Sequence, residues 1–155
     1  MLESQDFHYL LRIVIATVLS AVVGFDRQRG NKPAGMRTHM LVGLGAAVFV
    51  VLGELMPAYF AAETLQQDEM QYDPIRILEA VVGGVAFLGA GTIFFARGEN
   101  VVKGLTTAAS LWATAAMSMA VALGHYILAI GTTVLIVFIL QVVYLLEQRG
   151  EWDDG

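Results

Sequence analysis

The sequence lacks cysteine and is poor in charged residues. With no cysteine among 155 residues, disulfides and thiolate metal sites are excluded. Charged residues make up 15% of the chain and hydrophobic residues 57%, whereas a soluble domain has about 25% and about 45–50%. A water-soluble core of this length could not hide so much apolar surface, so the composition predicts a membrane protein.

Catalytic and metal-binding motifs are also missing. There is no H-x-x-x-H or H-E-x-x-H pair, no P-loop and no G-x-S-x-G turn. His8 and His125 fall on the opposite side of the membrane from His39 in the topology derived below, so the three cannot share one metal. We predict no enzyme activity, no cofactor and no nucleic-acid partner, and the sequence leaves any metal ligand unknown.

Five apolar segments are long enough to cross a bilayer, which takes about 20 residues. They lie at residues 7–25, 36–60, 74–95, 104–123 and 125–146. The N-terminus lacks the positive region of a signal peptide, so we expect the first segment to be retained. The sequence therefore predicts an all-α, polytopic membrane helix bundle of five transmembrane helices at 1–150, followed by a short acidic tail at 151–155.

A proline and a glycine predict where one segment begins and how two others connect. Pro74 suits the first turn of the third helix. Gly124 alone separates the last two segments, which predicts an antiparallel hairpin.

Lysine and arginine are concentrated on one side of the predicted helices. That side carries Arg27, Arg29, Lys32, Arg37, Arg97, Lys103 and Arg149. The other side carries Arg12, Arg76 and an acidic connection at 61–73. The positive-inside rule then places the N-terminus in the periplasm and the C-terminus in the cytoplasm of a bacterial inner membrane.

The first connection is more polar than topology requires. Asp26 ends one helix and Arg37 begins the next, and the helix dipole disfavours both placements. We therefore expect an ion pair between them. The whole connection is the predicted functional cluster, which comprises Asp26, Arg27, Lys32, Gly35, Arg37, Thr38 and His39.

The third connection resembles the first. Residues 25–27 (FDR) lead to 35–38 (GMRT), and residues 95–97 (FAR) lead to 104–107 (GLTT). This likeness predicts that the first two helices repeat in parallel as the third and fourth. Sites in transporters with such repeats lie between the repeated units.

The middle helices are rich in small and hydroxyl residues, for which two interpretations stay open. Small side chains allow close helix packing and hydroxyls can bond across the contact. Alternatively, the hydroxyls line a polar path, with Thr92, Thr106, Thr107 and Ser110 as its candidates.

Charged residues within the apolar segments give two further expectations. Arg76 and Glu79 are spaced to pair on one helix face. Glu54 lies about one turn before Pro57, and we expect it to be solvated near the outer surface.

Several blocks of sequence together resemble the MgtC/SapB family of bacterial inner-membrane proteins. The blocks are residues 24–28 (GFDRQ), 32–42 (KPAGMRTHMLV), 45–47 (GAA), 84–93 (GVAFLGAGTI) and 102–112 (VKGLTTAASLW). The resemblance implies a five-helix membrane domain linked to growth in low magnesium and to virulence. Some members are thought to restrain the proton-translocating ATP synthase. Many members are longer, with a soluble C-terminal domain, and the family often has Glu at the position of Asp26.

The sequence leaves three hypotheses for function. The first is a non-enzymatic inner-membrane protein of magnesium homeostasis and virulence that acts through a membrane protein partner or a homo-oligomer, or by moving an ion or small solute. The second is a channel or transporter for an ion or small solute. The third is a regulatory protein whose small-residue faces bind another protein's helix.

Overall fold

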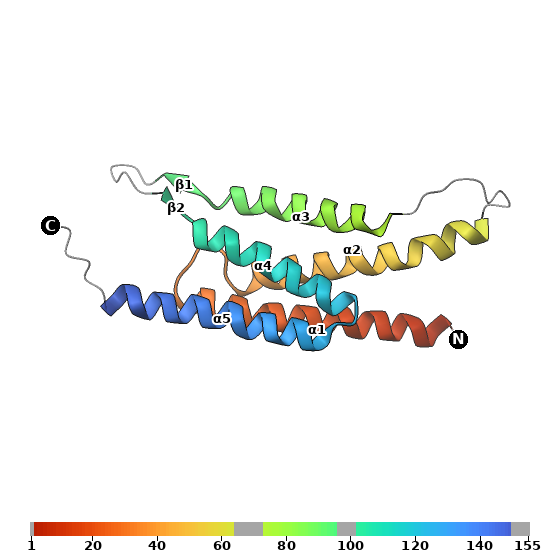
Figure 1. Cartoon of the computed structure of the whole chain (residues 1–155), viewed down its shortest axis with the longest axis horizontal. Helices are drawn as coiled ribbons and strands as arrows, with labels where there is room; N and C mark the ends of the chain where they lie inside the picture. The colour runs from red at the N-terminus through yellow and green to blue at the C-terminus, as the bar shows by residue number, and fades with distance from the viewer. Residues whose placement is uncertain (1, 64–72, 96–101, 150–155) are drawn as a thin grey trace.

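The described part of the chain forms a bundle of five helices with one short β-ribbon. The computed structural model describes residues 2–63, 73–95 and 102–149. The elements are α1 (Leu2–Arg29), α2 (Met36–Glu63), α3 (Pro74–Ala90), β1 (Phe94–Phe95), β2 (Val102–Lys103), α4 (Leu105–Ala122) and α5 (Tyr126–Arg149). All five helices run roughly along the long axis of the molecule (Figure 1). The prediction of an all-α helix bundle is confirmed.

Three of the described helices, α1, α2 and α4, are long and apolar enough to cross a membrane. The helix α5 contains a shorter apolar stretch, Tyr126–Val142, and α3 has 17 residues. The chain is thus a membrane protein by the length and composition of its helices, and the count of five spans stays a prediction.

The third helix is shorter than the sequence predicts. It was expected to reach Phe95 but ends at Ala90, and Phe94–Phe95 pairs with Val102–Lys103 in an antiparallel ribbon. Gly104 allows this turn because its φ of 95° is left-handed, and a β-carbon there would overlap the carbonyl oxygen of Thr92. The ribbon lies beside the start of α4 (Figure 1).

Local signals define the other helix ends. The side chain of Asp73 caps α3 by accepting a hydrogen bond from Ile75 N at 3.0 Å, and Pro74 takes the first turn as predicted. Gly124 has a φ of 83° between α4 and α5. These two helices pack against each other as the predicted hairpin.

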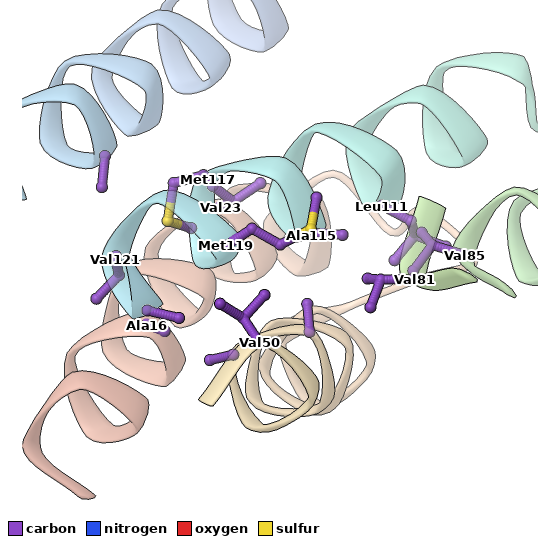
Figure 2. Packing of buried hydrophobic residues seen from close by; sticks show 14 of the residues in the cluster. Ala16, Val23, Val50, Val81, Val85, Leu111, Ala115, Met117, Met119 and Val121 are labelled. Carbon is purple, nitrogen blue, oxygen red and sulfur yellow. The ribbon is translucent and has the colours of Figure 1, made fainter. Parts of the chain in front are cut away.

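The helix α4 is the centre of the bundle and contacts each of the other four helices. In its membrane-length window 61% of the residues are buried, against 22% for α1 and 33% for α2. Figure 2 shows Leu111 of α4 beside Val81 and Val85 of α3, with Met117 and Val23 further along the core. Small side chains on α4 let its neighbours approach closely, which explains why it occupies the middle.

The predicted repeat of the first two helices as the third and fourth stays a prediction. A short turn joins α1 to α2, whereas the connection between α3 and α4 contains the β-ribbon. Arg97, which matches Arg27 in the proposed repeat, lies outside the described residues. The acidic tail at 151–155 also lies outside them.

Candidate functional site

Buried polar side chains follow one line along the contact between α1, α2 and α4. On α4 they recur at a spacing of three to four residues, which places them on one helix face. We call this line the polar seam. It comprises Ser20 and Arg27 on α1, His39 on α2, and Thr107, Ser110, Thr114 and Ser118 on α4.

Arg27 is the charged member of the polar seam. Its side chain is 5% exposed, and its Nη2 donates a hydrogen bond to Thr107 Oγ1 at 2.9 Å. Its Nε has no hydrogen-bond partner, and no carboxylate pairs with the guanidinium, among the residues that the structure describes. Burying a cation without a counter-ion is energetically unfavourable. Arg27 is therefore the strongest candidate in the seam for a residue kept for function.

His39 is fully buried next to Arg27 in the seam. Its Nδ1 lies 3.0 Å from the carbonyl oxygen of Gly35, and its Nε2 lies 3.2 Å from Ser110 Oγ. A carbonyl only accepts, so Nδ1 carries a proton. Ser110 Oγ also lies 2.8 Å from the carbonyl oxygen of Thr107, and its single hydroxyl proton serves either this carbonyl or His39 Nε2. The side chains of Arg27 and His39 therefore both attach to one turn of α4, and they fix α1 and α2 against it.

The middle of the seam is closed. Ser20 Oγ and Ser118 Oγ are 3.1 Å apart and both residues are fully buried. Gly43 of α2 faces them so closely that a β-carbon would overlap Ser20 Oγ and lie 2.7 Å from Ser118 Oγ. Thr114 Oγ1 bonds the carbonyl of Ser110, four residues earlier in its own helix. The hydroxyls of Ser20, Ser118 and Thr114 therefore contribute to close packing, and the polar path through the predicted residues stays a prediction.

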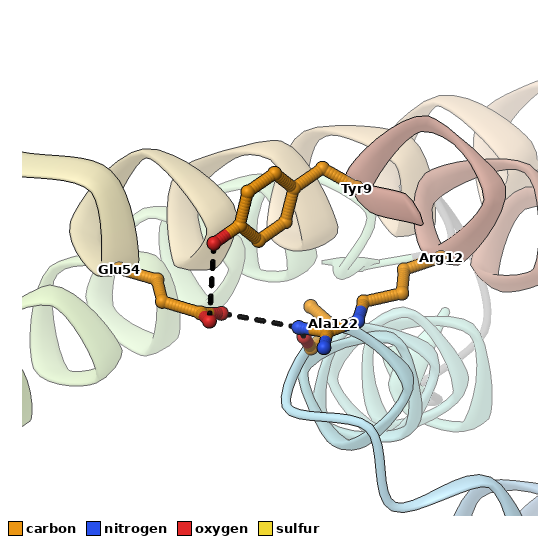
Figure 3. A network of polar contacts seen from close by, with 4 residues as sticks. All are labelled: Tyr9, Arg12, Glu54 and Ala122. Carbon is orange, nitrogen blue, oxygen red and sulfur yellow. Dashed lines mark hydrogen bonds and ion pairs between the residues drawn. The ribbon is translucent and has the colours of Figure 1, made fainter. Parts of the chain in front are cut away.

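A second polar cluster lies beside the C-terminal end of α4 (Figure 3). Glu54 of α2 accepts hydrogen bonds from Tyr9 OH at 3.2 Å and from Arg12 Nη1 at 3.1 Å. Arg12 Nη1 also donates to the carbonyl of Ala122, where α4 ends, at 3.0 Å. A cavity of about 430 Å³ adjoins Arg12 and Glu54. This cluster ties three helices together at the end far from Arg27.

This second cluster was not predicted from the sequence. Arg12 was counted only among the basic residues of the outer side. Glu54 is exposed, as expected for a solvated residue, but it also pairs with Arg12. One signal could have found it, because an arginine within an apolar helix needs a partner. Glu54 is the single acidic residue of 36–60.

The predicted functional cluster divides into two groups in the structure. Arg27, Gly35 and His39 come together with Thr107 and Ser110 of the predicted polar path. Five other predicted residues stay outside the seam: Asp26, Lys32, Arg37, Thr38 and Thr106.

The expected ion pair between Asp26 and Arg37 is absent from the described part of the chain. Asp26 Oδ1 instead accepts a hydrogen bond from Gln141 Nε2 of α5 at 3.1 Å. Arg27 and Arg29 occupy the same last turn of α1, and their charges offset the unfavourable placement of Asp26. Arg37 faces a groove between α2 and α3.

Two other expectations also need correction. Arg76 pairs with Asp73 at 3.9 Å and not with Glu79. Asp73 is the N-cap of α3 and lies three residues before Arg76, within reach of its side chain. Thr92 Oγ1 donates to the carbonyl of Gly89 at 2.7 Å and closes the turn after α3. It therefore lies in the turn at the ribbon and outside the polar seam.

The described ranges contain no cluster of residues that could bind a metal ion. No three residues from among His, Asp and Glu lie close enough together there to hold a metal ion. The site is therefore a buried hydrogen-bonded seam built around one cation.

Comparison with known proteins gives consistent matches over most of the chain. The Escherichia coli protein named "Putative magnesium transporter YhiD" is 40% identical over 141 residues, covering 91% of this chain. "Protein MgtC" of Salmonella typhimurium is 38% identical over 130 residues and 84% of the chain. "Protein SrpB" of Synechococcus elongatus is 39% identical over 131 residues and 78% of the chain. No solved structure matches.

These matches cover only part of the relatives. The chain spans 63% of the length of YhiD, 50% of MgtC and 67% of SrpB. The sequence profile of the MgtC family matches residues 13–149, which include the polar seam and all of α2 to α5. The chain belongs to the MgtC family.

Proposed function

We propose that this chain is a bacterial inner-membrane protein of magnesium homeostasis that acts through a membrane protein partner, with no catalytic step. The name of the relative YhiD, a putative magnesium transporter, supports the link to magnesium. The family resemblance extends the proposal to growth in low magnesium and to virulence.

The observation that carries the proposal is the buried, unpaired charge of Arg27 in a closed seam. A Mg²⁺ ion about 6 Å from this guanidinium, at an effective dielectric constant of about 20, would be repelled by about 5–6 kcal/mol. Asp26 is adjacent to Arg27 and attracts it electrostatically, but its Oδ1 accepts a hydrogen bond from Gln141, and it makes no ion pair with the guanidinium among the described residues. The geometry therefore favours an indirect role in magnesium homeostasis over conduction of the ion.

The proposed docking region for the partner is the end of the bundle where α1 turns into α2. Lys32 and Thr38 are exposed there, within one or two helical turns of the buried Arg27. The positive charges at this end support a cytoplasmic location for it, with the N-terminus in the periplasm, by the positive-inside rule. The seam would hold this end in the shape that the partner recognises.

Growth at limiting magnesium tests the role of the seam. We expect a strain that lacks the gene to be rescued by the wild-type chain but not by Arg27→Gln, because glutamine removes the buried charge. Arg76→Gln is the matched control, since Arg76 is exposed at the other end. Both variants must accumulate in the membrane to the wild-type level. Full rescue by Arg27→Gln would contradict the proposal.

Reconstitution tests the indirect role separately. Liposomes containing the purified chain and a magnesium-sensitive dye should take up Mg²⁺ no faster than empty liposomes. Rapid uptake that Arg27→Gln alters would reject the proposed mechanism, even if the link to magnesium holds.

Transport is the second candidate function. It is favoured by the presence of polar clusters at both ends of one helix contact, Arg27 with His39 and Arg12 with Glu54. Such a seam would carry solute only if the Ser20 and Ser118 contact opened. Flux of any small cation or anion in the same liposomes would support this candidate.

A further inference from the structure

A long groove runs between α2 and α3, on the other side of α2 from the polar seam. Its volume is about 920 Å³, and apolar residues line nearly all of it. On α2 the lining stripe runs from Arg37 to Met56, a rise of about 29 Å at about 1.5 Å per residue. That length matches the hydrocarbon core of a bilayer, which is about 30 Å thick.

Glycines leave open space along the groove. Gly45 of α2 and Gly84 of α3 both line it, and a β-carbon at either position would meet no atom within 4 Å. Large side chains such as Phe49 and Leu88 form the walls and are more than half exposed. Exposed apolar residues occur on any lipid-facing surface, but here they border a groove that contains open space.

Both ends of the groove carry an arginine. Arg37 lies at the end near the α1–α2 turn, and Arg76 lies at the opposite end. Arg76 is paired with Asp73. The side chain of Arg37 makes no ion pair or hydrogen bond within the part of the chain that the structure describes, and Thr38 is exposed beside it in the lining.

We propose that this groove binds an anionic phospholipid, with the phosphate at Arg37 and Thr38 and an acyl chain between α2 and α3. The arginine and the hydroxyl provide donors for phosphate oxygens, and the apolar channel fits a hydrocarbon chain. Cations at both ends match the anionic phosphate layers on the two faces of a bilayer. A transmembrane helix of a partner would need an acidic residue at the end next to Arg37, because Arg76 is already paired with Asp73. This lipid site shares Thr38 with the docking region proposed above, but it does not depend on that function.

Native mass spectrometry of the purified chain tests the site. The protein is equilibrated in mixed micelles with phosphatidylglycerol or phosphatidylcholine, and the retained lipid is counted. We expect wild type to retain phosphatidylglycerol in preference. Arg37→Gln should weaken retention of phosphatidylglycerol about fivefold, the effect of removing one cation at a membrane surface, and should abolish the preference.

Filling the groove separates a bound lipid from a loose annulus. Gly84→Leu should retain neither phosphatidylglycerol nor phosphatidylcholine, because the new side chain would fill the open space of the groove without meeting protein atoms. Gly45→Leu repeats the test from the other wall in case one variant misfolds. Gly131→Leu on α5, where a β-carbon also meets nothing within 4 Å, and Arg29→Gln are the matched controls and should bind as wild type does.

Three results would overturn the proposal. One is unchanged lipid retention by both groove-filling variants. Another is a loss in Arg29→Gln equal to that in Arg37→Gln, because this would show a general charge effect. The third is a wild-type dimer that Gly84→Leu dissociates, because a second copy would then occupy the groove.

Discussion

Replacing Gly24 by alanine should push α1 and α2 apart where Gly24 packs against Met36 and His39. A β-carbon at Gly24 would lie 2.6 Å from Met36 Cα and 2.9 Å from His39 Cβ. Carbon atoms in contact normally lie about 3.5–4.0 Å apart, so the helices must separate by about 1 Å. Met36 Cα belongs to the backbone and cannot rotate away. The same shift would strain the hydrogen bond of 3.2 Å between His39 and Ser110.

Two opposing effects set the magnitude for Gly24→Ala. Overpacking of a tight contact lowers the free energy of unfolding by about 1–3 kcal/mol, whereas alanine favours the helix over glycine by about 0.8–1.0 kcal/mol. Gly45→Ala in α2 receives only the second effect, because its β-carbon meets nothing within 4 Å. The two variants should therefore differ by about 1–3 kcal/mol.

Unfolding in mild detergent, followed by circular dichroism during heating, measures this difference. Gly24→Ala should unfold at a lower temperature than wild type, and Gly45→Ala at the same or a higher temperature. If the two variants unfolded together, the close approach of α1 and α2 at Gly24 would be wrong.

Two further variants probe the ends of the bundle by the same measurement. Glu54→Gln should lower the free energy of unfolding by about 0.5–1 kcal/mol, a small effect because Glu54 is 43% exposed and its ion pair with Arg12 is screened. Arg76→Gln is its control and should be neutral, since that pair is longer and its arginine is 83% exposed; equal effects would contradict a specific role for Arg12 and Glu54. Gly104→Ala should destabilise the chain by at least about 1–2 kcal/mol, because its φ of 95° is left-handed. Wild-type stability of Gly104→Ala would contradict the described turn.

The helices were predictable because their signals are local. The length of the apolar segments predicted the number and approximate positions of the helices. Pro74 marked the start of α3 and Gly124 the turn between α4 and α5, and the structure confirms both. The β-ribbon was missed because residues 94–95 are as apolar as a helix end. Its formation depends on Gly104, twelve residues after Thr92, which a reading of the apolar segment does not include.

Pairing was predicted less well than position. Asp26 and Arg37 were paired from their charges and closeness in sequence, but the two side chains leave the turn in different directions, toward α5 and toward α3. Arg12 and Glu54 are 42 residues apart and do pair. The rotation of each helix about its own axis decides which side chains meet. The positions of charged residues in the sequence do not reveal that rotation.

The sequence by itself determined a helical membrane protein, its family and a polar connection after the first helix, because these depend on composition and on short motifs. The tertiary structure decided which of those polar residues are buried together. It placed Arg27 and His39 on one turn of α4 and left Arg37 facing the groove. The physical reason is close packing at Gly24 and Gly43, which sets the rotation of α1 and α2 against α4.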